Sequence, residues 1–349
     1  MAEVQPFRAL HYDLERTGGL QAVAAPPYDV IDADQRAALV ARSPHNVVEI
    51  DLPVDPAGGD PYAHAAATLD AWRSDGVLAR DDEPALWALE QGYTGPDGHR
   101  RTRRGFFARV RVEDYGPGRI RPHERTHPGP KEDRLRLTRA TRANLSPIFS
   151  LYDDPAGAAW GAVEPHLAGA PWGEVSDEDG TRHRLWRVSD AGAGEAVRET
   201  LRDTELLIAD GHHRYETARV FHEEGGAGHV LMCLVSLQDP GLTVFPTHRL
   251  LTGLKDDSAK QQAIRETLTR DFEVEEVGAG ELSPDGARER TEFGYMDSFH
   301  RQPYRAVLKD QAIADAASST EPYASGRPAN FATRPPYQSP VDPSSPLRV

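Results

Sequence analysis

A strand pattern that runs into a helix pattern in the middle of the chain could form a phosphate site. The apolar run Glu205–Ala209 predicts a strand, and His213–Glu224 has a helical pattern. The residues at the junction are Asp210, Gly211, His212, His213 and Arg214. Glycine at a strand exit lets backbone amides approach an anion, and the helix points its N–H groups and positive dipole end at it. We therefore expect the last four to bind phosphate.

Asp210 has two possible roles at this junction. At the end of the strand it could accept a ligand hydroxyl or hold Mg²⁺. In the simpler alternative, Asp210 is the N-cap of an ordinary helix with histidines on its surface.

A second candidate is His123-Glu124-Arg125-Thr126-His127, which matches the H-E-x-x-H pattern of zinc hydrolases. That pattern places both imidazoles on one helix face, with the glutamate as general base. Pro122 before the segment and Pro128-Gly129-Pro130 after it oppose a helix through His127. We therefore expect no zinc site and interpret the segment as a loop. In it, His123 and Glu124 would act on a polar ligand, with Glu124 as the general base.

Cations surround this loop, although the protein as a whole is acidic. The chain of 349 residues has 40 Lys and Arg against 55 Asp and Glu, a net charge of −15. Residues 99–142 alone hold 14 Lys and Arg and only 5 Asp and Glu. Nonspecific DNA binding needs basic residues to neutralise phosphates, so a nucleic-acid partner is not expected. A small anion suits one basic stretch better, and Lys131 and Arg134 are candidates to bind it; a solvated arginine-rich surface is the alternative.

Periodicity along the chain predicts a mixed α/β fold. Helical patterns cover Tyr62–Ser74, Arg134–Ala143, Ala158–Glu164, Glu195–Arg202, His213–Glu224 and Ala259–Arg270. Strand patterns cover Val47–Leu52, Leu86–Tyr93, Gly105–Val112, Ile148–Tyr152, Leu185–Val188, Glu205–Ala209, His229–Leu237, Phe272–Val277 and Tyr304–Leu308. The single cysteine, Cys233, lies in one of these strands and is expected to be a core thiol.

We expect three regions along the chain. Residues 1–155 form an N-terminal mixed α/β part, and residues 156–310 carry the phosphate-binding segment. Residues 311–349 hold 7 of the 28 prolines and few apolar residues, too few to offset the entropy of ordering, so a disordered tail is expected. There is neither an apolar run of membrane-spanning length nor a signal-peptide pattern, so we expect a cytoplasmic protein without a membrane partner. The sequence leaves the oligomeric state open.

Six short segments, taken together and in order, resemble the domain-of-unknown-function 1015 family of the ParB and sulfiredoxin superfamily. They are Pro26–Ile31, Arg121–Thr126, Lys131–Leu135, Asn144–Phe149, Ala209–Ala218 and Pro246–Leu250. The resemblance spans residues 5–310 approximately. It implies a ParB/sulfiredoxin-like nucleotide-binding core with additional mixed-sheet elements.

The resemblance also implies a function linked to nucleotides. Relatives with a similar phosphate-binding segment include a kinase that makes O-phosphoserine from free L-serine with ADP or ATP, and sulfiredoxin, which holds ATP phosphates. By this analogy we expect ATP or ADP with Mg²⁺ as cofactor and a small molecule as acceptor. Further candidates to bind the substrate are Asn144, Thr247, His248 and Arg249.

Two alternatives stand beside the kinase. ParB binds CTP beside a similar segment and clamps DNA, so a nucleotide-binding regulator without turnover is the second hypothesis, and the net charge argues against its DNA-clamping form. The family continues with an ordered segment after Tyr304–Leu308, where this chain has its Pro/Ser-rich tail. A degenerate family member with impaired function is therefore the third hypothesis.

Overall fold

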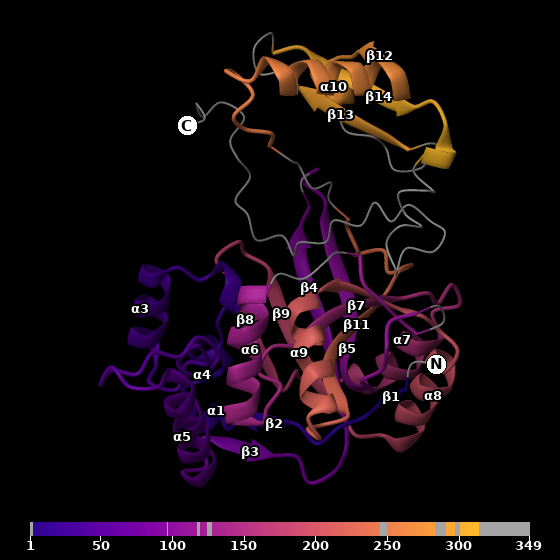
Figure 1. Cartoon of the computed structure of the whole chain (residues 1–349). Coiled ribbons are helices and arrows are strands. Elements are labelled where there is room, and N and C mark those ends of the chain that lie inside the picture. The colour runs from indigo at the N-terminus through magenta and orange to yellow at the C-terminus, as the bar shows by residue number, and fades with distance from the viewer. Residues whose placement is uncertain are drawn as a thin grey trace. The chain divides into compact units, whose positions relative to one another are not determined.

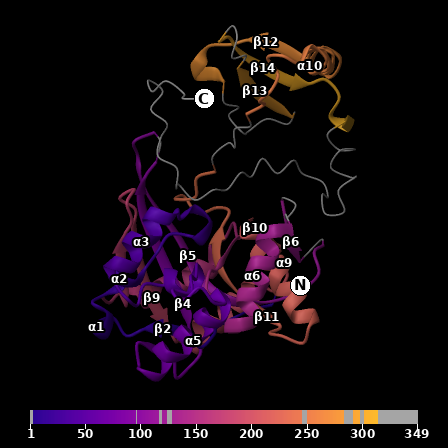
Figure 2. The ribbon, with the colours of Figure 1, turned by 60° about the vertical axis from the view of Figure 1, so that its left-hand side comes forward.

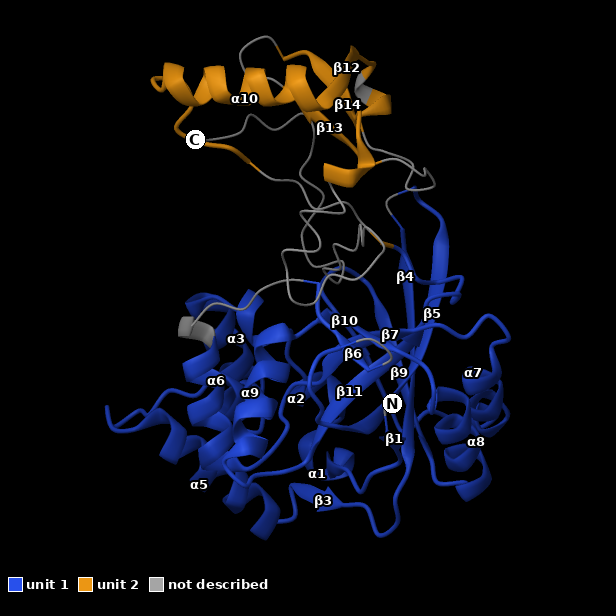
Figure 3. Ribbon diagram, turned by 45° about the vertical axis from the view of Figure 1, so that its right-hand side comes forward, with its two compact units in different colours: residues 1–243, 334–349 blue, residues 244–333 orange. Residues whose placement is uncertain are grey.

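The fold comes from a computed structural model, which describes residues 3–95, 97–116, 119–123, 128–244, 250–282, 291–296 and 301–313. The contacts of the chain define two compact units, one formed by residues up to 243 and one by residues 244–333 (Figure 3). Residues on both sides of 155 contribute strands to the same sheet of the first unit, so the expected division there does not separate two sheets. The tail expected from residue 311 lies outside the described residues from 314 onward.

The first unit is built on a nine-stranded mixed sheet in the described part of the chain. The strand order is β6-β10-β7-β11-β5-β4-β9-β8, with β1 paired to β5. The strands are β1 (Val4–Gln5), β4 (Leu86–Thr94), β5 (Arg100–Arg111), β6 (Ile120–Arg121), β7 (Ile148–Tyr152), β8 (Gly173–Ser176), β9 (Arg182–Val188), β10 (Leu206–Asp210) and β11 (His229–Ser236). The β6–β10 and β7–β11 pairs are parallel and the other pairs are antiparallel. The mixed α/β fold class expected from the sequence is therefore confirmed.

Four strand ends meet at one edge of this sheet. Because β6 and β10 are parallel, both end there. Because β7 is antiparallel to β10 and parallel to β11, β7 and β11 both begin there. The segments that precede or follow these ends, which are far apart in sequence, are thus brought together.

Side chains of the central strands alternate between two apolar clusters, as the pleat requires. On β11, alternate residues from Val230 to Leu234 belong to the larger cluster, with α7 (Ala158–Val163), α8 (Ala191–Leu201) and Tyr215. Cys233 faces the other way, into a smaller cluster that includes half-buried aromatic residues. Cys233 is buried, which confirms the expected core thiol.

Three helices lie side by side along this unit (Figures 1 and 2): α6 (Pro128–Thr141) contacts both α5 (Pro61–Ser74) and α9 (His212–Glu223). Helix α6 begins six residues before the predicted helical pattern. The prolines at 128 and 130 fall in its first turn, where a missing N–H is tolerated. Asp60 caps α5 by accepting from the N–H of Tyr62.

The strand predicted at Val47–Leu52 is wrong, because Val48–Asp51 form the short helix α4. The side chain of Asn46 accepts from the N–H of Val48 at 3.1 Å and donates to the main-chain oxygen of Ala22 at 3.0 Å. A local side-chain bond of this kind starts a turn instead of a strand. The other predicted helices and strands are present, β7 with the predicted ends and the rest with ends that differ.

The first unit contains several further short elements and one longer helix, α3. They are β2 (Leu10–Tyr12) paired with β3 (Leu78–Arg80), α1 (Leu14–Thr17), α2 (Leu20–Val23), the 3-10 helix η1 (Tyr28–Val30), α3 (Ala33–Arg42) and a second 3-10 helix, η2 (Glu164–Leu167). Asp32 forms a capping box with Gln35 at the start of α3.

The second unit is a small α/β arrangement. Helix α10 (Ser258–Asp271) precedes an antiparallel sheet in the order β12-β14-β13, whose strands span Phe272–Glu276, Pro303–Leu308 and Glu292–Met296, and a 3-10 helix, η3, spans Ala279–Glu281. Among the helices that the structure describes in either unit, none is both long enough and apolar enough to cross a membrane.

Candidate functional site

The predicted phosphate-binding segment forms the turn from β10 into α9. Gly211 has a φ of +97°, in the left-handed region, and it is the N-cap of α9, which begins at His212; glycine has no side chain to cap the first turn. A Cβ at Gly211 would lie 3.0 Å from Nε of Arg214, so the turn needs glycine both for its backbone and for space. First-turn N–H groups have no partner within a helix, so a helix start with a glycine N-cap directly after a strand suits an anion. The N-cap is Gly211 and not Asp210.

The carboxylate of Asp210 binds Arg214 instead. Nη2 of Arg214 donates to Oδ2 of Asp210 at 2.6 Å, and Nη1 donates to the main-chain oxygen of Pro147, just before β7. The Arg214 side chain is 14% exposed and that of Asp210 33% exposed, so both can be reached from solvent. The pair fixes the guanidinium beside the first turn of α9.

Two of the histidines predicted at the site, His123 and His212, contact each other. The N–H of His123 donates to Nε2 of His212 at 3.1 Å, and the rings meet edge to face with centroids 4.5 Å apart. Nε2 of His123 lies 3.0 Å from the main-chain oxygen of Ala209, and because a carbonyl only accepts, this nitrogen is the donor. These bonds attach the segment after β6 to the end of β10.

A second charged cluster stands on α4, α6 and η1. Nη1 of Arg134 donates to the main-chain oxygen of Asp51 at 2.7 Å and lies 3.2 Å from its Oδ1. Nη2 of Arg134 lies 2.7 Å from Oδ2 of Asp133, and the guanidinium stacks 3.9 Å from the ring centroid of Tyr28. The hydroxyl of Ser146 donates to the other Asp51 oxygen at 2.6 Å. Arg134 is buried, so its charge is met within the protein.

The two clusters interact electrostatically. Burial raises the pKa of Asp51, and the Ser146 hydrogen bond and the charges of Arg134 and Arg214 oppose that rise. Burial likewise raises the pKa of Tyr28, against the same two arginines. Arg134 and Arg214 therefore act on one patch of the molecule.

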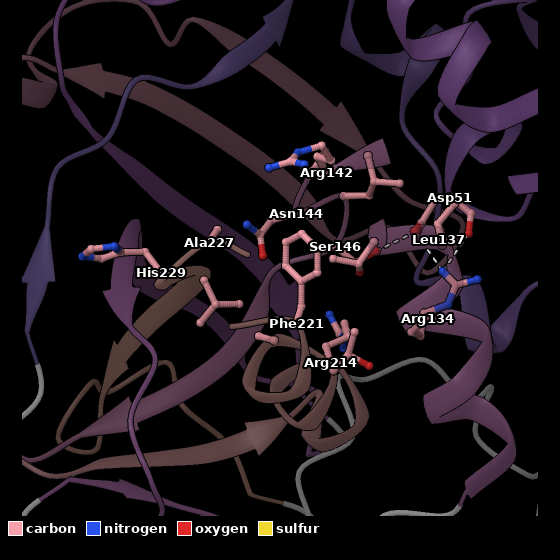
Figure 4. A pocket seen from close by; sticks show the side chains of 16 residues that line it. Asp51, Arg134, Leu137, Arg142, Asn144, Ser146, Arg214, Phe221, Ala227 and His229 are labelled. Atoms are coloured by element: carbon pink, nitrogen blue, oxygen red, sulfur yellow. Dashed lines mark hydrogen bonds and ion pairs between the residues drawn. The ribbon is translucent and has the colours of Figure 1, made fainter. Parts of the chain in front are cut away.

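A small cavity connects the clusters (Figure 4). Its lining includes the predicted residues Arg134, Asn144 and Arg214, together with Asp51 and Ser146. Its volume is about 60 Å³, which is room for only a few water-sized groups. A fragment such as a hydroxymethyl or carboxylate group fits, whereas a whole nucleotide does not.

Lys131 and His213 lie close to these clusters, and other predicted residues fall outside the described chain. Lys131 is in the first turn of α6, where its main-chain oxygen faces the hydroxyl of Thr217 at 3.4 Å. His213 is half-buried in the first turn of α9. The predicted residues outside the described ranges are Glu124, Thr247, His248 and Arg249, together with His127 of the zinc pattern.

Of the zinc pattern only His123 is described, and it lies in a bend after β6. Over the described residues, no group of three or more His, Cys, Asp and Glu side chains could hold a metal ion. Among the described residues, Asp210 therefore belongs to no such group.

Four residues of the site were not singled out from the sequence, namely Tyr28, Asp51, Asp133 and Ser146. Three of them carried a signal, because they lie in the family-like segments Pro26–Ile31, Lys131–Leu135 and Asn144–Phe149. The convergence of these segments on the Ala209–Ala218 segment could have identified them. Asp51 had no such signal, since its surroundings were predicted as a strand.

Comparison with known proteins gives a family and no further relative. The family described as "Protein of unknown function (DUF1015)" matches residues 4–325, which is most of the chain. No curated protein and no solved structure matches the chain. Three of the family-like segments, Lys131–Leu135, Asn144–Phe149 and Ala209–Ala218, line the cavity and lie within the matched range, and the chain belongs to the DUF1015 family.

Proposed function

We propose that this protein is a nucleotide-dependent small-molecule kinase, with free L-serine as the first acceptor to test. The acceptor hydroxyl oxygen attacks the terminal phosphorus of the nucleotide, the bond from that phosphorus to the bridging oxygen breaks, and the hydroxyl proton passes to Glu124. With ATP the products are ADP and a phosphate ester, and with ADP they are AMP and the same ester. We also propose, from the family resemblance, that the fold contains a ParB/sulfiredoxin-like nucleotide-binding core.

The observation that carries the proposal is the turn from β10 into α9. A helix start behind a left-handed glycine, with Arg214 beside it, presents backbone N–H groups, a helix dipole and a guanidinium to phosphate oxygens. Phosphoryl transfer needs positioning and charge neutralisation more than covalent help from the protein. His213 lies in the same first turn and could donate to a phosphate oxygen.

Asp210 is the residue that would hold Mg²⁺. Magnesium bound to a nucleotide commonly takes only one or two carboxylates from the protein, so a single accessible carboxylate beside the phosphates fits it. When bound, the ion would neutralise charge on the transferred group. Asp210 would then exchange its bond with Arg214 for the ion, which frees Nη2 of Arg214 for phosphate.

The cavity supports a small acceptor. We assign only the hydroxyl end of the acceptor to the cavity, which is too small for a nucleotide and lies against Arg214. Asn144 lines it and is exposed. Arg134 binds Asp51 and Asp133, so we assign it the role of positioning the wall of the cavity. Lys131 would stabilise the negative charge of the transferred phosphoryl group.

The test is direct. Purified full-length protein is incubated with Mg²⁺, ATP or ADP, and a panel of free amino acids, and phosphorylated products are identified by mass spectrometry. Product with serine that is lost in Arg214→Ala and in Glu124→Gln, and kept in the matched control Arg219→Ala on the same helix, supports the kinase. Nucleotide binding without any product would favour the regulator, and no nucleotide binding would contradict both.

A further inference from the structure

The side chain of Arg103 on β5 is held in place by hydrogen bonds, but it has no carboxylate partner among the described residues. Its Nε and Nη2 donate to Oε1 of Gln91 at 2.9 and 2.6 Å, and Gln91 is a neutral side chain. Arg103 forms no ion pair with any residue that the structure describes. Nη1 of Arg103 likewise has no hydrogen-bond partner within the described ranges. The donors on that side of the guanidinium are therefore available to a ligand.

A polar chain across three strands orients this guanidinium. Arg103 is opposite Gln91 on β4, and Gln91 is opposite His183 on β9. Arginine only donates, so the Gln91 oxygen must face Arg103 and its NH₂ group must face Nδ1 of His183, at 2.9 Å. His183 then carries its proton on Nε2 and donates to Asp177 at 2.8 Å. Because these donor and acceptor roles allow each side chain only one orientation, the direction of the Arg103 guanidinium is fixed.

Arg103 points along an apolar face of the sheet toward the candidate site. Its guanidinium carbon lies 4.9 Å from the ring centroid of Phe149. Phe149 is paired with Asp210 on β10, across a bulge, so the two side chains share one side of the sheet. The Phe149 ring is half-buried, and it lies between Arg103 and the Asp210–Arg214 pair.

The charge of Arg103 is costly where it stands. Burial lowers the pKa of Arg103, with Asp239 among the groups that oppose this shift, although Asp239 forms no ion pair with it. Arg134 and Arg214, in contrast, each bind a carboxylate of the protein. Arg103 is half-buried, so an anion can reach it, and a cation without a carboxylate partner is stabilised by an anion that binds it. Planar, bidentate recognition by arginine suits a carboxylate especially well.

We propose that Arg103 binds the carboxylate of the acceptor, whose body crosses the Phe149 ring and whose hydroxyl lies at the phosphate end beside Asp210. This inference rests on the proposed kinase function and adds a specificity residue to it. The enzyme would then select acceptors that carry both a hydroxyl and a carboxylate. Gln91, His183 and Asp177 act as positioning residues through Arg103.

The first test measures ligand binding at Arg103 and does not require kinase activity. Full-length protein is treated with phenylglyoxal, which modifies exposed guanidinium groups, and modification of Arg103 is followed by peptide mass spectrometry. Free L-serine at saturating concentration is expected to slow modification of Arg103 several-fold, whereas ethanolamine, which lacks the carboxylate, is not. If no free amino acid in the panel protects Arg103, the inference is overturned whether or not the protein is a kinase.

The second test uses the kinase assay with Arg103→Gln. The KM for serine is expected to rise about 10- to 100-fold, the range of a charge-assisted contact, while the nucleotide Kd stays within twofold. The matched control is Arg101→Gln on the same strand, whose guanidinium binds Asp97; it should change neither constant. An unchanged KM in Arg103→Gln, or an equal loss of nucleotide affinity, would overturn the inference and leave the kinase function standing. If a free amino acid protects Arg103 in a protein that shows no kinase activity, the binding role of Arg103 stands and the proposed kinase function is contradicted.

Discussion

The guanidinium of Arg134 on α6 forms a buried ion pair with the carboxylate of Asp51 on α4, with 3.2 Å between Nη1 and Oδ1. The same nitrogen bonds the main-chain oxygen of Asp51, and Ser146 satisfies the second carboxylate oxygen. The pair therefore joins two helices and the segment before β7. It forms one wall of the cavity, and Arg214 lines the same cavity.

Replacement of Arg134 by methionine should unfold this wall. The Arg134→Met variant leaves the buried Asp51 carboxylate without its cation, and breaking a buried pair costs about 3–5 kcal/mol of the free energy of unfolding. Urea unfolding followed by circular dichroism measures it. The control Arg136→Met, an exposed residue of the same helix that stacks on Tyr62, should cost less than about 1 kcal/mol. Equal losses in the two variants would contradict the structural role of the pair.

Replacement of Asp51 by asparagine should change how stability depends on pH. Burial raises the pKa of Asp51 in the folded protein above its value in the unfolded chain. The contribution of this group to stability is then complete below the unfolded pKa and is lost as pH rises through the folded pKa. The free energy of unfolding of Asp51→Asn minus that of wild type should therefore increase between pH 4 and pH 7. A difference that falls over this range would mean that the ion pair outweighs burial.

Replacement of Gly211 by alanine should damage both the turn and its arginine. Its φ of +97° strains an L-residue by about 1–3 kcal/mol, and the new Cβ would press on Arg214. Gly225, at the other end of α9, has a φ of +85° and no atom within 4 Å of an added Cβ. Gly225→Ala should thus show a comparable loss of stability, and only Gly211→Ala should weaken nucleotide binding. If both variants weaken nucleotide binding equally, Gly211 has no special role.

The thiol of Cys233 should be inert in the folded protein. Burial raises its pKa to about 12, so the reactive thiolate is scarce at pH 8. Iodoacetamide at pH 8 should leave Cys233 unmodified in native protein and alkylate it fully in urea, as measured by intact mass. Rapid alkylation of native protein would contradict the burial of β11.

The long buried strands and the six predicted helices are present in the structure, and the short elements were not predicted. Runs such as Ile148–Tyr152 and His229–Leu237 are apolar on both faces, and buried strands of this kind are recognisable locally. The run Val47–Leu52 looks similar, but Asn46 bonds its own downstream backbone and starts a helix there. The spacing of apolar residues does not reveal the hydrogen bonds of a single polar side chain such as that of Asn46.

The types of side chain at the site could be predicted from the sequence, but the contacts between them could not. The Asp210–Arg214 turn has a local signature, since glycine and a helix start follow a strand directly. The bond between Asp210 and Arg214 was not foreseen, although the two residues are one helical turn apart. The role of Arg134 depended on Asp51, which is 83 residues away in sequence, and the role of Arg103 depended on register across three strands.

Nucleotide binding by Arg214 is the central claim, and calorimetric titration tests it most directly. Mg²⁺-ADP or Mg²⁺-ATP is titrated into wild-type protein, Arg214→Ala and the matched variant Arg219→Ala, whose guanidinium binds Asp114 on another segment. We predict that wild type binds, that Arg214→Ala weakens the Kd about 10- to 100-fold through loss of a charge-assisted contact, and that Arg219→Ala stays within twofold of wild type. Absence of binding to wild type, or equal Kd values for wild type and Arg214→Ala, would contradict the account.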